Sequence, residues 1–254
     1  MNPGVDEGIL MLAGDGRLSA VSCMPLGQPD SDRVRALTDL DVDLGLHLDF
    51  TECLDHQGFR LPLGRLILAC YTRQVPVAMI EQEIVRQLDA FEACFGRMPD
   101  YVDGHQHVHQ LPGIRERLLK ILADRYSGRR CWLRSTLPPE GARLPFAGKA
   151  RIIGMLGGWR LRALADQRAV PMNRSLLGVY DFSGDREAYA ALIERWLTIA
   201  VDGDLLMCHP ATSKHQRDAI AVQRLCEFDV LSGPRFTEAL TGNGVSIRRF
   251  SPVC

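Results

Sequence analysis

The sequence predicts an α/β fold, and a single-domain (β/α) barrel spanning residues 1–254 fits its length best. Short apolar runs alternate with longer amphipathic runs along the chain, which is typical of βα units. No linker or low-complexity segment indicates a domain boundary. Three of the apolar runs end near a histidine, where parallel strands carry active-site residues.

Seven short apolar runs have the length and the boundaries of strands. They span residues 18–24, 43–50, 101–103, 131–133, 176–182, 205–208 and 245–250. A closed eight-stranded barrel needs one strand more. We therefore expect this chain to lack the first strand of its barrel, through a late start codon or a true loss of the segment, and to have marginal solubility and low activity as a result.

Two amphipathic helices are predicted most clearly. The first begins at Pro76, stops at Gly96 and carries one apolar face formed by Ile80, Ile84, Leu88, Phe91 and Phe95. The second opens with Pro112 and buries Ile114, Leu118, Ile121 and Leu122. Between residues 144 and 174, arginines and glycines interrupt the apolar spacing, so the sequence leaves helix and loop open there.

The charge and hydropathy of the sequence disfavour nucleic acid and membranes as partners. Lys and Arg total 30 against 31 Asp and Glu, and the net charge of −1 gives no general electrostatic reason to expect nucleic acid or an anionic membrane. No apolar run reaches membrane-spanning length, and the first twenty residues lack the pattern of a secretory signal. The sequence therefore predicts a cytoplasmic protein.

The motifs of several enzyme classes are missing. The eight cysteines are scattered without a C-x-x-C pair, which favours reduced thiols. The chain has no G-x-S-x-G elbow, no phosphate-binding P-loop, no H-E-x-x-H helix and no G-x-G-x-x-G fingerprint. A serine hydrolase, a nucleotide enzyme and a Rossmann oxidoreductase are therefore disfavoured.

Three segments carry polar, metal-competent residues at the ends of predicted strands. They are GLHLDFT (45–51), YVDGHQHVHQLPG (101–113) and DLLMCHPATS (204–213). Because the carboxyl ends of parallel strands share one face, we expect His47, His105 and His209 to converge. A core histidine bonded to backbone is the alternative for each of them taken alone.

The second segment indicates metal binding most strongly. In an extended chain, His105, His107 and His109 would lie on one side, with Asp103 nearby to accept a ring N–H. Imidazole is the commonest protein ligand for a catalytic divalent ion. His105 is closest to the strand end and is the better ligand candidate, whereas we expect His107 and His109 to support the loop.

Two other residues at strand exits have plausible roles in catalysis. His209 precedes Pro210, which holds it out of helical geometry, and a histidine there suits a general acid; a structural histidine at the barrel rim is the alternative. Arg134 could bind a polar or anionic substrate group, or form a surface ion pair. We expect His56 and His215 to be solvated loop residues.

Taken together, these segments resemble the YdjC-like carbohydrate deacetylase family, which includes chitooligosaccharide deacetylases and a hopanoid-biosynthesis-associated branch. The resemblance covers nearly the whole chain. It is carried by PGVDEGILMLAGDGRLSAVSCM, GLHLDFT, FGRMPDYVDGHQHVHQLPG, DLLMCHP and RLCEFDVL. It implies a barrel of the glycoside hydrolase/deacetylase type and metal-dependent hydrolysis of the N-acetyl group of an amino sugar or oligosaccharide.

The resemblance also implies roles for individual residues. His47 and His105 would be metal ligands, and His209 would donate a proton to the departing amine. The family expects one divalent ion, Mg by resemblance, whereas two imidazoles favour Zn or Co. The partner would be a small N-acetylated sugar, with no nucleic acid and no membrane span, and a homodimer is possible.

One departure from the family pattern concerns the general base. Family members begin with a strand ending in Ala-Asp-Asp-Phe-Gly, just before the segment that starts here at Asn2 and Pro3. Asp49 and Asp103 are the nearest substitutes, and Asp103 is the candidate catalytic carboxylate. Two other functions remain open: a catalytically silent sugar-binding homologue, and a metal hydrolase of a non-sugar amide or ester.

Overall fold

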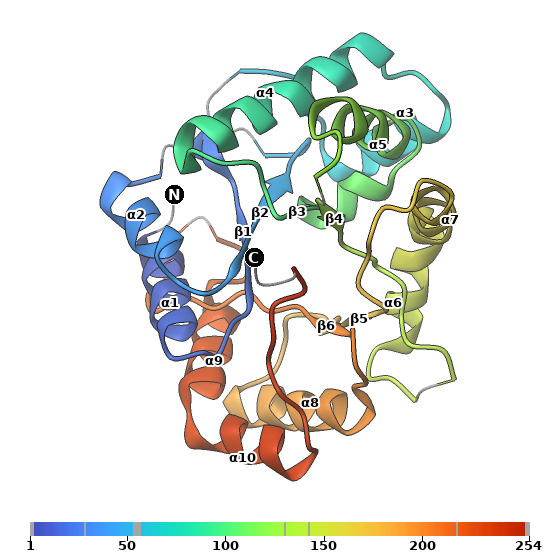
Figure 1. Ribbon diagram of the computed structural model, residues 1–254. Coiled ribbons are helices and arrows are strands. Elements are labelled where there is room, and N and C mark those ends of the chain that lie inside the picture. Colours follow the sequence, from blue (N-terminus) through green and yellow to red (C-terminus); the bar gives the residue numbers. More distant parts are fainter. Residues whose placement is uncertain are drawn as a thin grey trace.

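The computed structural model describes residues 3–27, 29–52, 57–129, 131–141, 143–216 and 218–251. Short parallel strands lie at its centre and helices surround them (Figure 1). The strands are β1 (Ala20–Cys23), β2 (Asp43–Leu48), β3 (Tyr101–Gly104), β4 (Trp132–Leu133), β5 (Leu176–Leu177) and β6 (Leu205–Leu206). Six of the predicted runs therefore contain a strand, although the last two strands are much shorter than expected.

The helices alternate with the strands, as the pattern of apolar runs predicts. In chain order they are α1 (Pro3–Gly14), α2 (Ser31–Thr38), α3 (Leu63–Tyr71), α4 (Val77–Phe95), α5 (Ile114–Arg125), α6 (Ala147–Ile153), α7 (Trp159–Gln167), α8 (Arg186–Ile199), α9 (Ala221–Ser232) and α10 (Pro234–Gly242). Single 3₁₀ turns span Pro25–Gly27 and His105–Gln110, and a π turn, Gly154–Gly158, joins α6 to α7. The segment that the sequence left open between residues 144 and 174 is therefore mostly helical.

The sequence predicted α4 and α5 correctly because their ends carry strong signals. Pro76 caps α4, and Gly96 ends it in the left-handed conformation with φ of 67°. All five residues of the predicted apolar face of α4 are buried. In α5, the predicted Ile114, Leu118 and Leu122 are buried, whereas Ile121 is only half-buried.

Two parallel sheets make up the described strands. One has the order β1-β2-β3-β4 and the other pairs β5 with β6. A parallel bridge between Leu133 and Met172 brings β4 towards the second sheet, and Leu176 N donates to Leu137 O at 2.7 Å. No pairing joins β1 to β6 in these ranges. The fold is thus mixed α/β with parallel strands, and a closed barrel is not confirmed.

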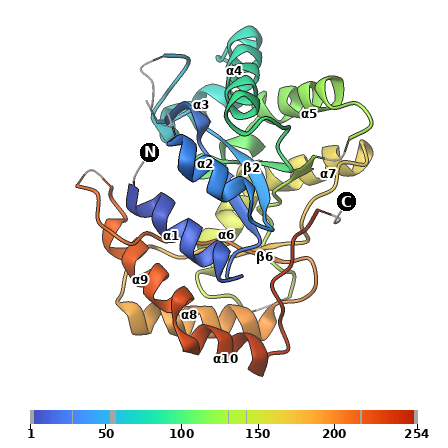
Figure 2. The same cartoon turned by 60° about the vertical axis from the view of Figure 1, so that its left-hand side comes forward.

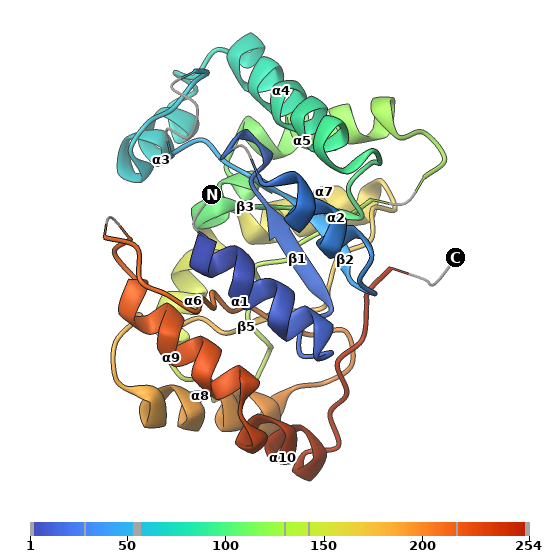
Figure 3. The ribbon, with the colours of Figure 1, turned by 90° about the vertical axis from the view of Figure 1, so that its left-hand side faces the viewer.

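Helix α1 packs between α2 and α9, which it contacts on opposite sides (Figure 3). Gly4 and Gly8 face the backbone after β6, where an added Cβ would come within 3.2 Å of Ala211 Cα at Gly8. Thr212 N also donates to Gly4 O at 2.9 Å. The small residues of α1 therefore let the segment after β6 lie close to the helix.

The predicted last strand, 245–250, is wrong. In the structure this segment leaves α10 and runs as a coil across the ends of the strands (Figures 1 and 2). The carboxylate of Asp43, at the start of β2, accepts hydrogen bonds from Phe250 N at 3.2 Å and Ser251 N at 2.9 Å. A buried carboxylate thus satisfies backbone groups that a neighbouring strand would otherwise bind.

Candidate active site

His47 and Asp103 form a pair at the carboxyl ends of β2 and β3. They are register partners on these parallel strands, and His47 Nδ1 lies 2.6 Å from Asp103 Oδ1. The Asp103 side chain is 1% exposed and that of His47 is 19% exposed, so the imidazole lies between the carboxylate and solvent. A carboxylate on Nδ1 fixes the ring orientation and leaves Nε2 as a free electron-pair donor.

Asp103 is held as a carboxylate by the groups around it. Arg134 Nη1 forms an ion pair with Oδ2, and Ser22 Oγ donates to the same oxygen at 3.0 Å. Burial alone would raise the pKa of Asp103, but the charges of Arg134 and His47 lower it below its usual range. Asp103 therefore stays ionised and orients His47 from its buried side, and its role as the catalytic carboxylate stays a prediction.

Gly45 in the GLHLDFT segment makes room for this arrangement. A Cβ on Gly45 would come within 2.3 Å of the Tyr101 ring, which lies across β2 at that point. The Tyr101 hydroxyl then reaches Ser22 Oγ at 2.8 Å, and Ser22 bonds Asp103. The register pairs Ser22 with Gly45 and Gly45 with Tyr101, so this polar chain crosses three strands.

His105 lies next to His47 on the same face. Their ring centroids are 5.5 Å apart in an edge-on arrangement, and His105 Nε2 lies 3.5 Å from Glu52 Oε1. Burial, followed by the charge of His47, lowers the pKa of His105 to about 4; the charge of His209 acts in the same direction. The His105 imidazole is therefore neutral at pH 7 and able to donate an electron pair.

The chain turns after β3 and does not stay extended, and His107 and His109 belong to this turn, as expected from the sequence. Residues 105–110 form a tight turn in which Gln106 and His107 have φ of 49° and 62°. The turn folds back on Gly104, where a Cβ would lie 2.8 Å from His109 N. His109 Nε2 donates to Arg134 O at 2.9 Å, and burial lowers the His109 pKa to about 4. His107 and His109 thus point into the protein, unlike His105.

Arg134 forms an ion pair, but this pair is buried and not on the surface as one of the two expectations had it. Its side chain is 5% exposed, and beyond Asp103 its Nη2 donates to Gly104 O at 2.8 Å. His107 Nδ1 also accepts from Nη2 at 3.3 Å. The cation is buried because the Asp103 charge needs a partner in an environment with little water.

His209 follows β6, and its side chain is 27% exposed. Behind it lies Glu227 of α9, a fully buried carboxylate that accepts from the His209 backbone N–H and from the Tyr180 hydroxyl at 2.5 Å. His209 Nδ1 is 3.8 Å from Glu227 Oε1, and the imidazole meets the Phe182 ring edge-on with a centroid distance of 5.1 Å. Glu227 and Phe182 therefore fix the position of this histidine.

Asp49 cannot act as a substitute base in this conformation. Its Oδ1 accepts from Thr51 N at 2.8 Å and from Glu52 N at 3.1 Å, which shapes the turn after β2. Arg60 Nε lies 3.3 Å from Oδ2, and Gln87 bonds both backbone groups of Asp49. These contacts occupy the carboxylate, which is buried.

The side chains of the candidate site fit a divalent metal ion only in part. His47 and the neutral His105 are adjacent imidazoles of the kind that can bind a divalent ion, and Asp103 lies against Nδ1 of His47. No group of three or more His, Cys, Asp or Glu side chains is placed to hold a metal within the ranges that the structure describes. Two imidazoles are thus the protein ligands that these residues offer.

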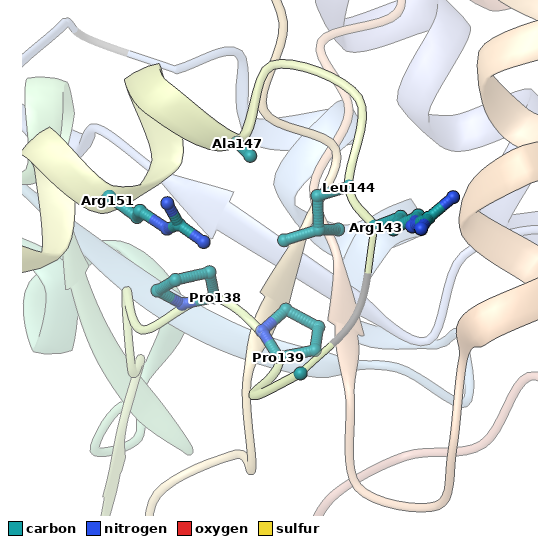
Figure 4. Close-up of a pocket in the computed structure, with 7 residues that line it drawn as sticks. Pro138, Pro139, Arg143, Leu144, Ala147 and Arg151 are labelled. Atoms are coloured by element: carbon teal, nitrogen blue, oxygen red, sulfur yellow. The ribbon is translucent and has the colours of Figure 1, made fainter.

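Two hollows lie near the carboxyl ends of the strands. The smaller is lined by His47 and Asp49, together with Met24, Pro25, Leu26, Arg60 and Gln87. The larger, a space of about 530 Å³ open to solvent, lies between α6 and the loop after β4. Arg151 extends over Pro138 in this space, whereas Arg143 points away from it (Figure 4). Of the candidate histidines, His47 borders the smaller hollow, and none of the three lines the larger one.

Comparison with known proteins places the chain in a family. Residues 1–242 match the model of a family described as YdjC-like protein. The chain belongs to the YdjC-like family. A similar protein from Mus musculus, named carbohydrate deacetylase, is 28% identical over 155 residues, which are 52% of this chain and 50% of that protein. The chain thus spans about half the length of this relative.

Other similar proteins align over nearly the whole chain. A carbohydrate deacetylase from Vibrio parahaemolyticus is 22% identical over 265 residues, covering 99% of this chain and 91% of that protein. A crystal structure from Enterococcus faecalis, described as a cellobiose-phosphate cleavage protein, has a TM-score of 0.67 at 18% identity and covers 98% and 92% of the two chains. The latter likeness supports the fold.

Sequence reasoning missed three residues of this site in the YdjC-like chain. Glu227 and Ser22 lie far from His47 and His105 in sequence, whereas Tyr101 stands only four positions before His105. Glu227 had one signal, an acidic residue inside the apolar face of a helix, because a buried carboxylate needs partners. Ser22 and Tyr101 carried no such signal. Of the other residues considered, His215 is exposed, His56, Cys53 and Cys254 lie outside the described residues, and the described cysteines are free.

Proposed function

We propose that this protein hydrolyses the N-acetyl group of an amino sugar or oligosaccharide, with the help of a divalent metal ion. The observation that carries the proposal is the His47–Asp103 pair with His105 beside it at the carboxyl ends of β2 and β3. Support also comes from relatives that bear the name carbohydrate deacetylase. A cytoplasmic location belongs to the same proposal.

In this proposal, His47 and His105 hold the ion, and Asp103 keeps the His47 ring oriented for that task. A bound divalent ion would supply Lewis-acid polarisation of the acetyl carbonyl. Resemblance to the family favours Mg, whereas the two imidazoles favour Zn or Co. Arg134 holds the Asp103 charge in place and does not contact the sugar.

His209 is the proposed proton donor to the departing amine. Its imidazole is partly exposed, and the buried Glu227 carboxylate lies within 3.8 Å of Nδ1. In this proposal the Glu227 carboxylate orients the His209 ring, and His209 gives a proton to the amine nitrogen. Water adds to the acetyl carbonyl carbon and loses a proton to solvent, the amide C–N bond breaks as the nitrogen gains the proton from His209, and acetate and a free amino sugar result.

Acetate release tests the proposal. The purified protein is incubated with N-acetylglucosamine and its oligomers in the presence of Mg, Zn or Co, and acetate is measured. We expect release by the wild type and a loss of at least about 100-fold in the His209→Ala variant. The His215→Ala variant is the matched control, because His215 is an exposed loop residue. No release from any N-acetyl sugar by the folded, metal-loaded protein would contradict the proposal.

Metal content separates the role of His47 from that of His209. Elemental analysis should show less bound metal in the His47→Ala variant and nearly unchanged metal in the His209→Ala variant. Parallel loss of metal in both variants would instead make His209 a ligand. Sugar binding without turnover would identify a silent binding homologue, and release from a non-sugar amide or ester would identify the other hydrolase.

A further inference from the structure

An exposed apolar patch lies on the outer wall of the molecule, away from the candidate active site. Ile152, Met155 and Trp159 are 55%, 66% and 53% exposed, on the helical run formed by α6, the π turn and α7. They follow one another at intervals of three and four residues, with the π turn and its Gly157 between the two helices. This run forms one margin of the molecule (Figure 1), and we call it the α6–α7 patch.

Positive charge surrounds the α6–α7 patch. Arg151 and Arg160 are exposed on the same helical run, and neither has an ion-pair partner among the residues that the structure describes. Residues 141–165 contain no Asp or Glu, although the whole chain has a net charge of −1. Their basic residues are Arg143, Lys149, Arg151, Arg160 and Arg162. Lys149 Nζ donates to Tyr180 O at 2.5 Å and Arg162 Nη2 donates to Arg174 O at 3.0 Å, so the positive charge beside the patch comes from Arg151 and Arg160.

We propose that the α6–α7 patch docks on an anionic lipid surface. Exposed Trp, Met and Ile side chains flanked by arginines are typical of helices that lie in the plane of a membrane interface. There the apolar side chains enter the headgroup region, and the arginines keep their charges near the lipid phosphates. The helix would lie on the membrane and not cross it, since none of the described helices is long and apolar enough to span a bilayer.

The charge of the patch favours lipid over a second copy of this chain. In a twofold dimer the patch of one copy contacts the same patch of the other copy. Arg151 and Arg160 would then lie close to the same positive charges of the second copy, which is unfavourable. An anionic surface instead neutralises them. The three apolar patch residues also lie outside the larger hollow, which is lined among others by Pro138, Ala147 and Arg151. The patch therefore offers exposed side chains and no pocket that would hold a peptide side chain.

The protein carries a built-in reporter for this test. Trp132 and Trp196 are 3% and 1% exposed, whereas Trp159 is 53% exposed, so a change in tryptophan fluorescence on docking reports Trp159. We expect phosphatidylglycerol vesicles at low salt to shift the emission to shorter wavelengths and to sediment with the protein. High salt should release the protein, and phosphatidylcholine vesicles should bind it at least about tenfold more weakly.

Two patch variants, each with a matched control elsewhere on the surface, distinguish lipid docking by the patch from nonspecific binding. The double variant Arg151→Glu with Arg160→Glu should bind phosphatidylglycerol at least about tenfold more weakly. Arg65→Glu with Arg195→Glu makes the same charge change on exposed residues of α3 and α8 and should leave binding intact. Ile152→Ser with Met155→Ser should also weaken binding, whereas Leu68→Ser with Val201→Ser, at exposed positions elsewhere, should not.

Several results would overturn the proposal. The first is a wild-type protein that does not bind phosphatidylglycerol vesicles, and the second is equal binding to phosphatidylglycerol and phosphatidylcholine vesicles. The third is a control double variant that weakens binding as much as the matching double variant of the patch. Polyglutamate that binds as tightly as the vesicles, with the same salt dependence, would show an acidic partner instead. A dimer in sedimentation that shields Trp159 from acrylamide would show a second copy on the patch.

Discussion

Asp103 organises the candidate active site at the scale of single residues. One oxygen meets His47 and the other meets Ser22 and Arg134, so the carboxylate joins β1, β2 and β3 to the residue after β4. A buried charge is tolerated only when it is paired and fully hydrogen-bonded. The consequence is that His47 has one defined orientation, which a metal ligand or a catalytic group requires.

Replacing Glu227 by Gln should lower kcat by about 10- to 100-fold without an equal change in KM. The carboxylate lies behind His209 and does not line the hollow beside His47, so its loss should affect proton donation more than sugar binding. Steady-state kinetics with the best N-acetyl sugar measure both constants.

The Tyr180→Phe variant is the control for Glu227. It removes a hydroxyl bonded to Glu227 Oε1 and keeps the carboxylate beside His209. We expect it to cost stability with a smaller effect on kcat. If Tyr180→Phe lowers kcat as much as Glu227→Gln does, Glu227 has only a structural role.

At the scale of elements, the π turn ties α6 and α7 to the turn that carries His105. Gln110 Nε2 donates to Ile153 O at 2.8 Å, and Arg115 Nη1 donates to Gln110 O at 3.0 Å. Gly157 has φ of 137°, and a Cβ there would lie 2.1 Å from Gln110 O. The extra residue of a π turn is thus accommodated by a glycine that packs directly on the candidate site's loop.

The Gly157→Ala variant should be destabilised by about 2–4 kcal/mol, from a strained φ and a collision with backbone. Gly154→Ala, three residues earlier, is the matched control. Gly154 has φ of −59°, and its added Cβ would meet side-chain atoms at 3.5 Å, which is ordinary contact. It should be neutral or slightly stabilising. Urea unfolding of both variants gives the comparison, and equal free energies of unfolding would contradict it.

A second element-scale prediction concerns the pH dependence of α4–α5 packing. Glu92 of α4 accepts from Arg125 Nε at 2.9 Å and from the Tyr126 hydroxyl at 2.5 Å. The hydrogen bond with Arg125 is the main cause that lowers the pKa of Glu92. A carboxyl group whose pKa is lower in the folded state stabilises the fold above its unfolded pKa of about 4.3, and this stabilisation is lost as the pH falls through the folded value.

Glu92→Gln should therefore reduce the free energy of unfolding by about 1 kcal/mol at pH 7, because the pair is partly exposed. The difference from wild type should shrink as the pH falls below about 4. Urea titrations at several pH values measure it. Glu238→Gln, an exposed change on α10, is the control and should have no such pH dependence. A difference that stays constant with pH would exclude the Glu92 charge as its source.

At the scale of the whole molecule, the carboxyl-terminal segment covers the amino-terminal ends of the strands, opposite the candidate active site. Arg249 Nε donates to Asp43 Oδ1 at 2.9 Å, and Phe250 packs on Trp132 with a centroid distance of 5.0 Å. Trp132 Nε1 also donates to Asp43 Oδ2 at 3.2 Å. A single buried carboxylate therefore joins segments 206 residues apart in sequence.

Asp43→Asn should destabilise the protein by about 2–4 kcal/mol, since it removes the charge and an acceptor for buried donors. Hydrogen exchange of residues 245–251 should accelerate as this segment is released. Asp41→Asn is the control, because Asp41 is 82% exposed and pairs only with Arg249 Nη1. It should cost less than about 1 kcal/mol. Similar exchange rates in the two variants would show that Asp43 does not anchor the segment.

The sequence by itself determined the α/β class, the positions of six strands and the limits of α4. It also determined that His47, His105 and His209 lie at or just after the carboxyl ends of strands. These features depend on local periodicity, caps and turn residues, which act within a few positions along the chain. The same local signals gave no warning that 245–250 is a coil or that Arg134 is buried. They indicated that His107 and His109 belong to a loop, without predicting the left-handed conformation of Gln106 and His107.

The tertiary structure decided those points because they depend on distant partners. Arg134 is buried since Asp103, on the neighbouring strand, needs a cation, and the register of β2 and β3 decides that His47 receives its carboxylate. The backbone N–H groups of Phe250 and Ser251 donate to the carboxylate of Asp43 and not to the edge of a strand. The free energy of pairing a buried charge exceeds the local preference of the backbone for strand or coil. The conformation of such segments therefore depends on contacts between residues that are distant in sequence, which local sequence patterns do not reveal.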